Sequence, residues 1–289
     1  MSFSRHIKVH TYNHTEAIQP HCDRSSGREK ECAFKGLKLE VKHKYHPNPR
    51  LSANHVAEYL DANATNRRNI LRDAKFPPII LLIPYSDAKS ALVGHFSRNQ
   101  AESQLDSRVQ ALRRKAELPE ISDFERRNCY LCVEAIESFQ AAEPKMKLGK
   151  IKFSRPGSQF PKQKISGVSV SVSIDLLTEK LDTKGGGAKG AAMLVFSKGG
   201  GPQKNMPERC KAISLLIFEL LKDQAKPGQI YDPTMCMAVD VFRGIVYPAK
   251  GEQRQLWKTV GTSCDEVTRI WPSVPPPANY NGPPLPKFA

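Results

Sequence analysis

The sequence Gly167-Val-Ser-Val-Ser-Val-Ser-Ile-Asp175 alternates apolar and polar residues, and it is followed by Gly190-Ala-Ala-Met-Leu-Val-Phe-Ser-Lys198. The alternation predicts a strand over 165–177 with one buried and one polar face. The second stretch is almost continuously apolar, which is typical of a central strand covered on both sides. An acid therefore closes the first predicted strand, and a lysine closes the second.

The residues around these two strands predict the rest of the fold. Apolar residues at helical spacing predict helices over 53–62, 67–75, 86–96, 101–117, 123–142, 207–224 and 253–271. Further strands are expected over 33–43, 79–84, 147–153, 235–242 and 245–247. We expect an α+β protein whose mostly helical N-terminal half surrounds a mixed β-sheet with a C-terminal β-β-α-β core.

The composition changes along the chain and suggests four parts. We expect a polar arm over 1–32, a helical region with one or two strands over 33–145, a β-rich core with two helices over 146–271, and a proline-rich tail over 272–289. The tail is expected to be extended and mobile. Its prolines would suit an aromatic groove, so a protein partner could dock through this segment.

The charge of the chain favours a polyanionic partner. The 289 residues contain 44 Lys and Arg against 29 Asp and Glu, a net charge of +15. We expect DNA or RNA as the partner, with a solvated basic surface as the alternative. No run of about 18 apolar residues is present, so no membrane span is expected. The seven scattered cysteines and the polar N-terminus predict a protein of the reducing cytoplasm.

The order of the strand with Asp175, the strand with Lys198, a helix and a further strand resembles the core of the PD-(D/E)XK nuclease superfamily, in particular its exonuclease-like branch. The resemblance covers about residues 167–247, with Ile174-Asp175-Leu176 and Phe196-Ser197-Lys198 as its two motifs. It implies that acids hold Mg²⁺ at the scissile phosphate while a lysine stabilises the charge that develops. Asp175 and Lys198 would then be catalytic.

The second motif departs from the family pattern. Phe196 stands where the family has its second metal-binding acid, and a phenyl ring cannot ligate a metal. The metal would then need Asp175 together with Glu58, Asp240 or Glu179. Three interpretations stay open. They are an active Mg²⁺-dependent nuclease, an inactive relative that binds nucleic acid or acts as a scaffold, and an unrelated α+β fold in which Asp175 and Lys198 have no catalytic role.

Basic residues gather on one helix edge, in the glycine-rich connection and along the expected 147–153 strand. The candidate nucleic-acid contacts are Arg67, Arg68, Arg72, Lys75, Lys184, Lys189, Lys150 and Lys152. Such residues would neutralise phosphates without reading the base sequence, and a solvated basic face is the alternative. A second function class is a non-enzymatic interaction protein of a larger complex that docks through its basic surface and its tail.

Two further groups contain residue types that can ligate a metal. Cys129 and Cys132 form half of a zinc motif inside a predicted helix, so we expect buried thiols. His6, His10 and His14 recur every four residues in the polar arm, where either a zinc site or a weakly ordered arm fits. No serine-hydrolase elbow, zincin motif or dinucleotide fingerprint is present.

Overall fold

The computed structural model describes residues 42–79, 84–98, 103–146, 148–149, 151–181, 187–197, 204–250 and 253–285. All of them belong to one unit, residues 40–289. The helices of this part are α1 (Ala53–Asp61), α2 (Ala64–Lys75), α3 (Ser86–Arg98), α4 (Ser103–Ala116), α5 (Asp123–Ala142), α6 (Met206–Asp223) and α7 (Arg254–Ile270). The strands are β1 (Arg50–Ser52), β2 (Ile151–Ser154), β3 (Gln163–Ile165), β4 (Val168–Ser171), β5 (Leu176–Leu181), β6 (Gly187–Val195), β7 (Met237–Asp240) and β8 (Ile245–Pro248). The expected α+β class is confirmed.

The larger sheet has the strand order β2-β5-β6-β7-β8. Strands β6 and β7 are parallel, and α6 connects them, whereas the other neighbours are antiparallel. The parallel register runs from Ala192 opposite Met237 to Val195 opposite Asp240. The expected C-terminal β-β-α-β core is therefore present as β5, β6, α6 and β7.

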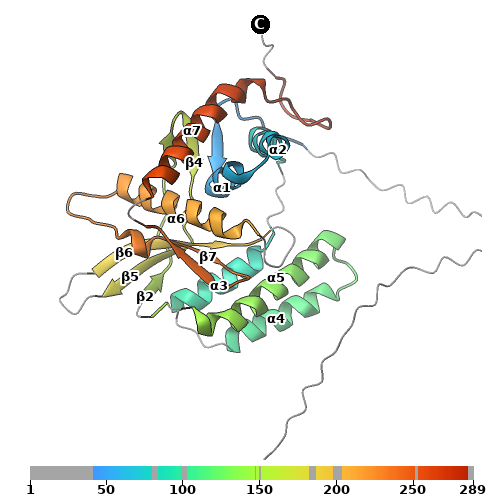
Figure 1. Cartoon of the computed structure of the whole chain (residues 1–289). Helices are drawn as coiled ribbons and strands as arrows, with labels where there is room; N and C mark the ends of the chain where they lie inside the picture. The colour runs from blue at the N-terminus through green and yellow to red at the C-terminus, as the bar shows by residue number, and fades with distance from the viewer. Residues whose placement is uncertain are drawn as a thin grey trace, which may run out of the picture. The chain divides into compact units, whose positions relative to one another are not determined.

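Helices cover both faces of this sheet, as Figure 1 shows. Along β6, Ala192 and Leu194 pack in the apolar cluster of α3, α4 and α5, while Met193 and Val195 pack in the cluster of α6 and α1. Successive residues of a strand point to opposite faces, so the continuous apolar run of β6 fills two cores at once. The cluster beneath α3–α5 joins residues on both sides of residue 146, since α5 and β6 both contribute to it.

The prediction of one strand over 165–177 was wrong, because this segment contributes to two sheets. Its first part forms β3 and β4, which belong to a three-stranded sheet of order β1-β4-β3. Ser166 and Gly167 turn the chain between them with φ values of 45° and 83°. Strand β4 pairs in parallel with β1, placing Leu51 beside Val170. Residues 172–175 then lead to β5, so Asp175 precedes a strand of the larger sheet instead of ending one.

Side-chain caps mark the starts of α1, α2 and α5. Ser52 accepts a hydrogen bond from the His55 amide and caps α1. The expected start of the second helix at residue 67 was wrong, because the Asn63 side chain accepts from the Asn66 amide and α2 begins at residue 64. Ser122 and Glu125 form a capping box at α5. No helix of the described ranges combines the length and the apolarity needed to cross a membrane.

Two further expected strands, 33–43 and 79–84, lie only partly within the described residues. The residues 33–41 and 80–83 lie outside the described part of the chain. Ile79, the first residue of an expected buried strand, is 49% exposed. Just before it, Pro78 forms an isolated antiparallel bridge with His43. The segment 42–46 therefore lies beside the end of α2, instead of joining the central sheet.

The described part of the proline-rich tail packs against its own chain, and it is not extended throughout. It begins with the 3-10 helix Trp271–Ser273, and the amide of Tyr280 donates to the carbonyl of Pro277 at 3.0 Å in a later turn. The Asn281 carbonyl accepts a hydrogen bond of 2.9 Å from the His43 amide. The ring of Tyr280 lies edge-on to Phe76, with 5.3 Å between the ring centroids. This contact to residues more than two hundred positions earlier was not foreseen from the sequence.

Candidate functional site

Asp175 is a buried carboxylate that holds the start of β5 to the neighbouring elements. Its Oδ2 accepts a 2.9 Å hydrogen bond from the Leu194 amide of β6, and its Oδ1 lies 2.7 Å from the ammonium of Lys89 on α3. Burial raises the pKa of Asp175, and the charge and hydrogen bond of Lys89 oppose that rise. Both carboxylate oxygens thus have protein partners, which is the arrangement of a structural acid.

Asp240, at the end of β7, organises the hairpin that follows it. Its Oδ1 accepts hydrogen bonds from the amides of Phe242 and Arg243, at 3.1 and 3.2 Å. Its backbone carbonyl accepts from the amide of Gly244 at 2.8 Å, where φ is 63°. Burial raises the pKa of Asp240, and the Arg243 amide and guanidinium act in the opposite direction. These bonds close a tight turn at Arg243–Gly244, between the expected strands 235–242 and 245–247.

Glu58 on α1 forms an ion pair with Arg209 on α6, with 2.7 Å between Oε1 and Nη2. The side chains are 13% and 9% exposed, so the pair lies mostly out of water. A buried pair of this kind is costly to break, because the remaining charge would be left without a partner. The pair joins α1 to the first turns of α6.

The three carboxylates proposed as metal ligands do not come together. Asp175 contacts α3 and lies on the α3–α5 side of the sheet. Asp240 follows Val239, whose side chain packs on that side, so its own side chain points to the α6 side. Burial raises the pKa of the Cys210 thiol on α6, and the negative charge of Asp240 raises it further. Across the described ranges, no three His, Cys, Asp or Glu side chains are arranged to hold a metal ion.

The lysine of the proposed catalytic pair, Lys198, lies outside the described residues, as do Lys150 and Lys184. Phe196, two positions earlier, is described and stacks on Tyr85 with 5.0 Å between the ring centroids. Glu179 forms an ion pair with Lys189 across β5 and β6, at 3.4 Å. Phe196, which stands where the resemblance would require a second acid, is thus part of an aromatic contact.

The candidate nucleic-acid contacts on α2 have different surroundings. Arg67 lies 3.2 Å from Glu266 and stacks over the Tyr59 ring, while Arg72 lies 3.7 Å from Asp73. Arg68 is exposed. Lys75 is only 2% exposed, and its ammonium donates to the carbonyls of Trp271, Pro272 and Val274. Burial lowers the pKa of Lys75. Lys75 therefore fastens the tail and does not face solvent.

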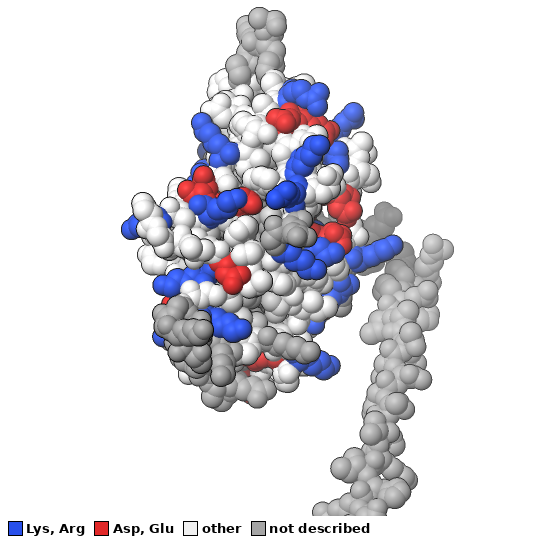
Figure 2. Space-filling model, turned by 60° about the vertical axis from the view of Figure 1, so that its left-hand side comes forward, with Lys and Arg blue, Asp and Glu red and all other residues white. Residues whose placement is uncertain are grey.

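The remaining described candidates lie on the larger sheet. Lys152 of β2 is exposed, and Lys189 of β6 is exposed beside Glu179. Figure 2 shows one face of the protein, on which Lys and Arg side chains are spread widely among fewer acidic ones. A surface of this kind suits non-specific attraction of polyanions.

A group of cations that the sequence did not single out lines a pocket of about 540 Å³ beside the small sheet. The pocket contains Arg50 of β1, Lys162 and Lys164 around β3, and His46, together with Pro47, Asn48, Pro49, Gly167 and Ser169. We call His46, Arg50, Lys162 and Lys164 the basic pocket. None of its lining residues is acidic. Within the described ranges, none of its cations is ion-paired to a carboxylate.

The pKa of His46 is lowered in this positively charged pocket. Burial lowers its pKa, and the charges of Arg50, Lys44 and Lys162 lower it further. The Arg50 guanidinium lies 3.3 Å from His46 Nε2, which suits a neutral imidazole that accepts the hydrogen bond. The pocket was missed from the sequence because Arg50 and Lys164 are more than one hundred residues apart. Only the pairing of β1, β4 and β3 brings them together.

The Cys129 and Cys132 thiols are buried in α5, as expected for core residues. Burial raises the pKa of both. The histidine-rich arm lies outside the described residues. No protein-family model matches the chain, and a search of curated proteins finds no match.

Proposed function

We propose that this chain binds the phosphate backbone of nucleic acid through the basic pocket. The observation that carries the proposal is the convergence of Arg50, Lys162, Lys164 and His46 around one pocket without an acidic residue. Each Lys or Arg that meets a phosphate releases condensed counterions, which is the main driving force of non-specific nucleic-acid binding. Lys42 and Lys44 are exposed just before the pocket and extend its positive surface.

We propose that the core of the fold, which resembles PD-(D/E)XK nucleases, serves as a scaffold for the binding surface. The order β5, β6, α6, β7 supports a nuclease-like core, since the family has strand, strand, helix and strand in that sequence. The magnesium site of Asp175, Glu58 and Asp240 does not fit the arrangement of these residues, because they lie on two faces of the sheet and have protein partners. We therefore assign no cleavage step to them and propose a binding role.

We propose a cytoplasmic setting because of the cysteine thiols. The five cysteines of the described residues are free and buried, which supports a protein of the reducing cytoplasm. The alternative function is an interaction protein that docks through its tail. The tail contacts at Phe76 and His43 favour an intramolecular role for residues 272–285.

The proposal is tested by measuring affinity for a fluorescently labelled oligonucleotide by anisotropy at low salt. The variant Lys162→Ala/Lys164→Ala should bind at least about tenfold more weakly than the wild type, because it removes two phosphate contacts. The matched control is Lys211→Ala/Lys222→Ala. It removes the same charge from α6, where each lysine is ion-paired to a glutamate three residues before it.

Two outcomes would overturn the proposal. One is that the wild type binds neither DNA nor RNA at low salt. The other is that the two double variants lose the same affinity, because the overall charge and not the basic pocket would then be responsible.

A further inference from the structure

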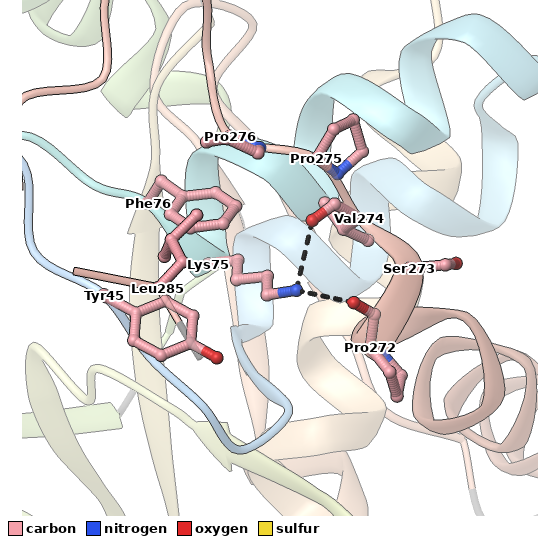
Figure 3. A pocket seen from close by; sticks show the side chains of 9 residues that line it. All are labelled: Tyr45, Lys75, Phe76, Pro272, Ser273, Val274, Pro275, Pro276 and Leu285. Carbon is pink, nitrogen blue, oxygen red and sulfur yellow. Dashed lines mark hydrogen bonds between the residues drawn. The ribbon is translucent and has the colours of Figure 1, made fainter. Parts of the chain in front are cut away.

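An apolar pocket of about 490 Å³ lies next to the positively charged surface and has a different character. Tyr45 and Phe76 form one wall together with Leu285, and prolines of the tail form the other wall, as Figure 3 shows. The rings of Tyr45 and Phe76 are stacked, with 5.6 Å between their centroids. We call this pocket the aromatic pocket.

Hydrogen bonds from Lys75 hold the tail where it forms one wall of the aromatic pocket. The Lys75 ammonium donates at 3.1 Å to each of the Pro272 and Val274 carbonyls, as the dashed lines in Figure 3 indicate. It also donates to Trp271 at 2.7 Å, and the Trp271 indole donates to the His46 carbonyl at 3.2 Å. The wall made by the tail is therefore tied to the segment that contributes to the basic pocket.

A third pocket shares a lining residue with the aromatic pocket and another with the basic pocket. Tyr45 lines both the aromatic pocket and a neighbouring one, which also contains Lys42, Lys44 and His46. His46 in turn lines the basic pocket. The cations that line the second and third of these neighbouring pockets are Lys42, Lys44, Arg50, Lys162 and Lys164, and no acidic residue lines any of the three pockets.

We propose that the aromatic pocket takes an unpaired nucleobase and that the chain prefers single-stranded nucleic acid. This inference rests on the proposed function, because the phosphates beside that base would meet the basic pocket. Single-strand binding sites combine a positive groove with aromatic side chains on which bases stack. In a duplex the bases are stacked on one another, so a base can enter a side pocket only when the strands are apart. DNA and RNA share this chemistry.

The test compares three labelled ligands on the full-length wild-type chain. They are an intact single strand, the same strand with abasic sites, and a duplex of equal length, each made as DNA and as RNA. The intact single strand should bind about tenfold more tightly than the abasic strand, which is the effect of one stacked base. It should also bind more tightly than the duplex.

Three variants test whether the tighter binding of the intact strand depends on the ring of Tyr45. Tyr45→Ala should lower the affinity for the intact strand to that for the abasic strand, and Tyr45→Phe should keep the wild-type affinity because the ring remains. Tyr130→Ala, a change at an exposed tyrosine of α5, is the control and should bind as the wild type does. A thermal melt of Tyr45→Ala checks that the fold persists, and the abasic comparison needs no variant at all.

The outcomes separate the two proposals. If intact and abasic strands bind equally well while Lys162→Ala/Lys164→Ala still weakens both, the nucleobase inference is wrong and the phosphate proposal stands. Equal affinity for duplex and single strand would contradict the preference in the same way. If the lysine variant binds every ligand as tightly as the wild type, the phosphate proposal itself fails.

Discussion

The ammonium of Lys89 lies 2.7 Å from the carboxylate of Asp175, and the Leu194 amide donates to the other oxygen of the same carboxylate. This arrangement joins α3, the start of β5 and the C-terminal end of β6 at one point. A carboxylate that looks catalytic from the sequence therefore has a structural environment.

Replacing Asp175 should destabilise the protein strongly. Asp175→Ala leaves the Leu194 amide without an acceptor and Lys89 without its partner, so we expect a loss of about 2 to 3 kcal/mol in the free energy of unfolding. Urea denaturation measures it. The control Asp73→Ala removes an exposed carboxylate, and a loss as small as in that control would contradict the structural role.

The titration of Asp240 should be visible in the pH dependence of stability. Burial raises its pKa above the ordinary 3.8, so the folded protein binds this proton more tightly than the unfolded chain does. That contribution is complete below about pH 4 and is lost as the pH rises through the raised pKa. Asp240→Asn cannot titrate, yet its side-chain oxygen can still accept from the amides of Phe242 and Arg243.

We therefore expect the free energy of unfolding of the wild type to fall, relative to Asp240→Asn, as the pH rises from about 4 to about 7. Urea denaturation of both proteins across that range gives the difference. A difference that stays constant, or that changes in favour of the wild type, would contradict the raised pKa.

Lys75 should control the attachment of the tail. Lys75→Met keeps an apolar side chain of similar length but removes the donors to three carbonyls, and we expect a loss of about 2 kcal/mol. Hydrogen exchange should become faster in residues 272–285. Lys222→Met, at an exposed lysine, should leave both quantities unchanged. Unaltered exchange in the tail of Lys75→Met would show that other contacts hold it.

Gly244 is required in the β7–β8 hairpin for two reasons. Its φ is 63°, and a Cβ at this position would collide with the Cβ of Ala142 at the end of α5. Gly244→Ala should cost about 2 to 4 kcal/mol. Gly228→Ala isolates the backbone term, since φ is 79° there but nothing lies within 4 Å of the added carbon, and it should cost about 1 kcal/mol. Equal losses in thermal unfolding would argue against the packing of Ala142 on the hairpin.

The sequence predicted the helices better than the sheets. The limits expected for α5, 123–142, are those observed, because a capping box and a long apolar stripe mark this helix locally. The prediction of one strand over 165–177 was wrong because the alternation of this segment is compatible with either sheet. Strand β4 pairs with β1, a strand of three residues that lies more than one hundred positions earlier. Local patterns contain no information about such a partner.

The candidate site was also predicted only in part, because the sequence marks single residues but not their distant partners. Asp175 was recognised as important from its place after a strand, whereas its partner Lys89 lies on a helix that the motif does not include. The basic pocket required the register of β1, β4 and β3 before its cations could be grouped. Lys75 was assigned to the surface because it follows Arg72 on a basic helix edge, and only the docking of the tail places it in the interior.

The central claim, that the basic pocket binds phosphates, is tested most directly by the salt dependence of nucleic-acid affinity. The logarithm of the binding constant for a single strand falls with the logarithm of the salt concentration by about 0.7 per neutralised phosphate. Lys162→Ala/Lys164→Ala should therefore reduce the slope by about 1.4 relative to the wild type, while Lys211→Ala/Lys222→Ala leaves it unchanged. Equal slopes for the wild type and the Lys162→Ala/Lys164→Ala variant would contradict the claim.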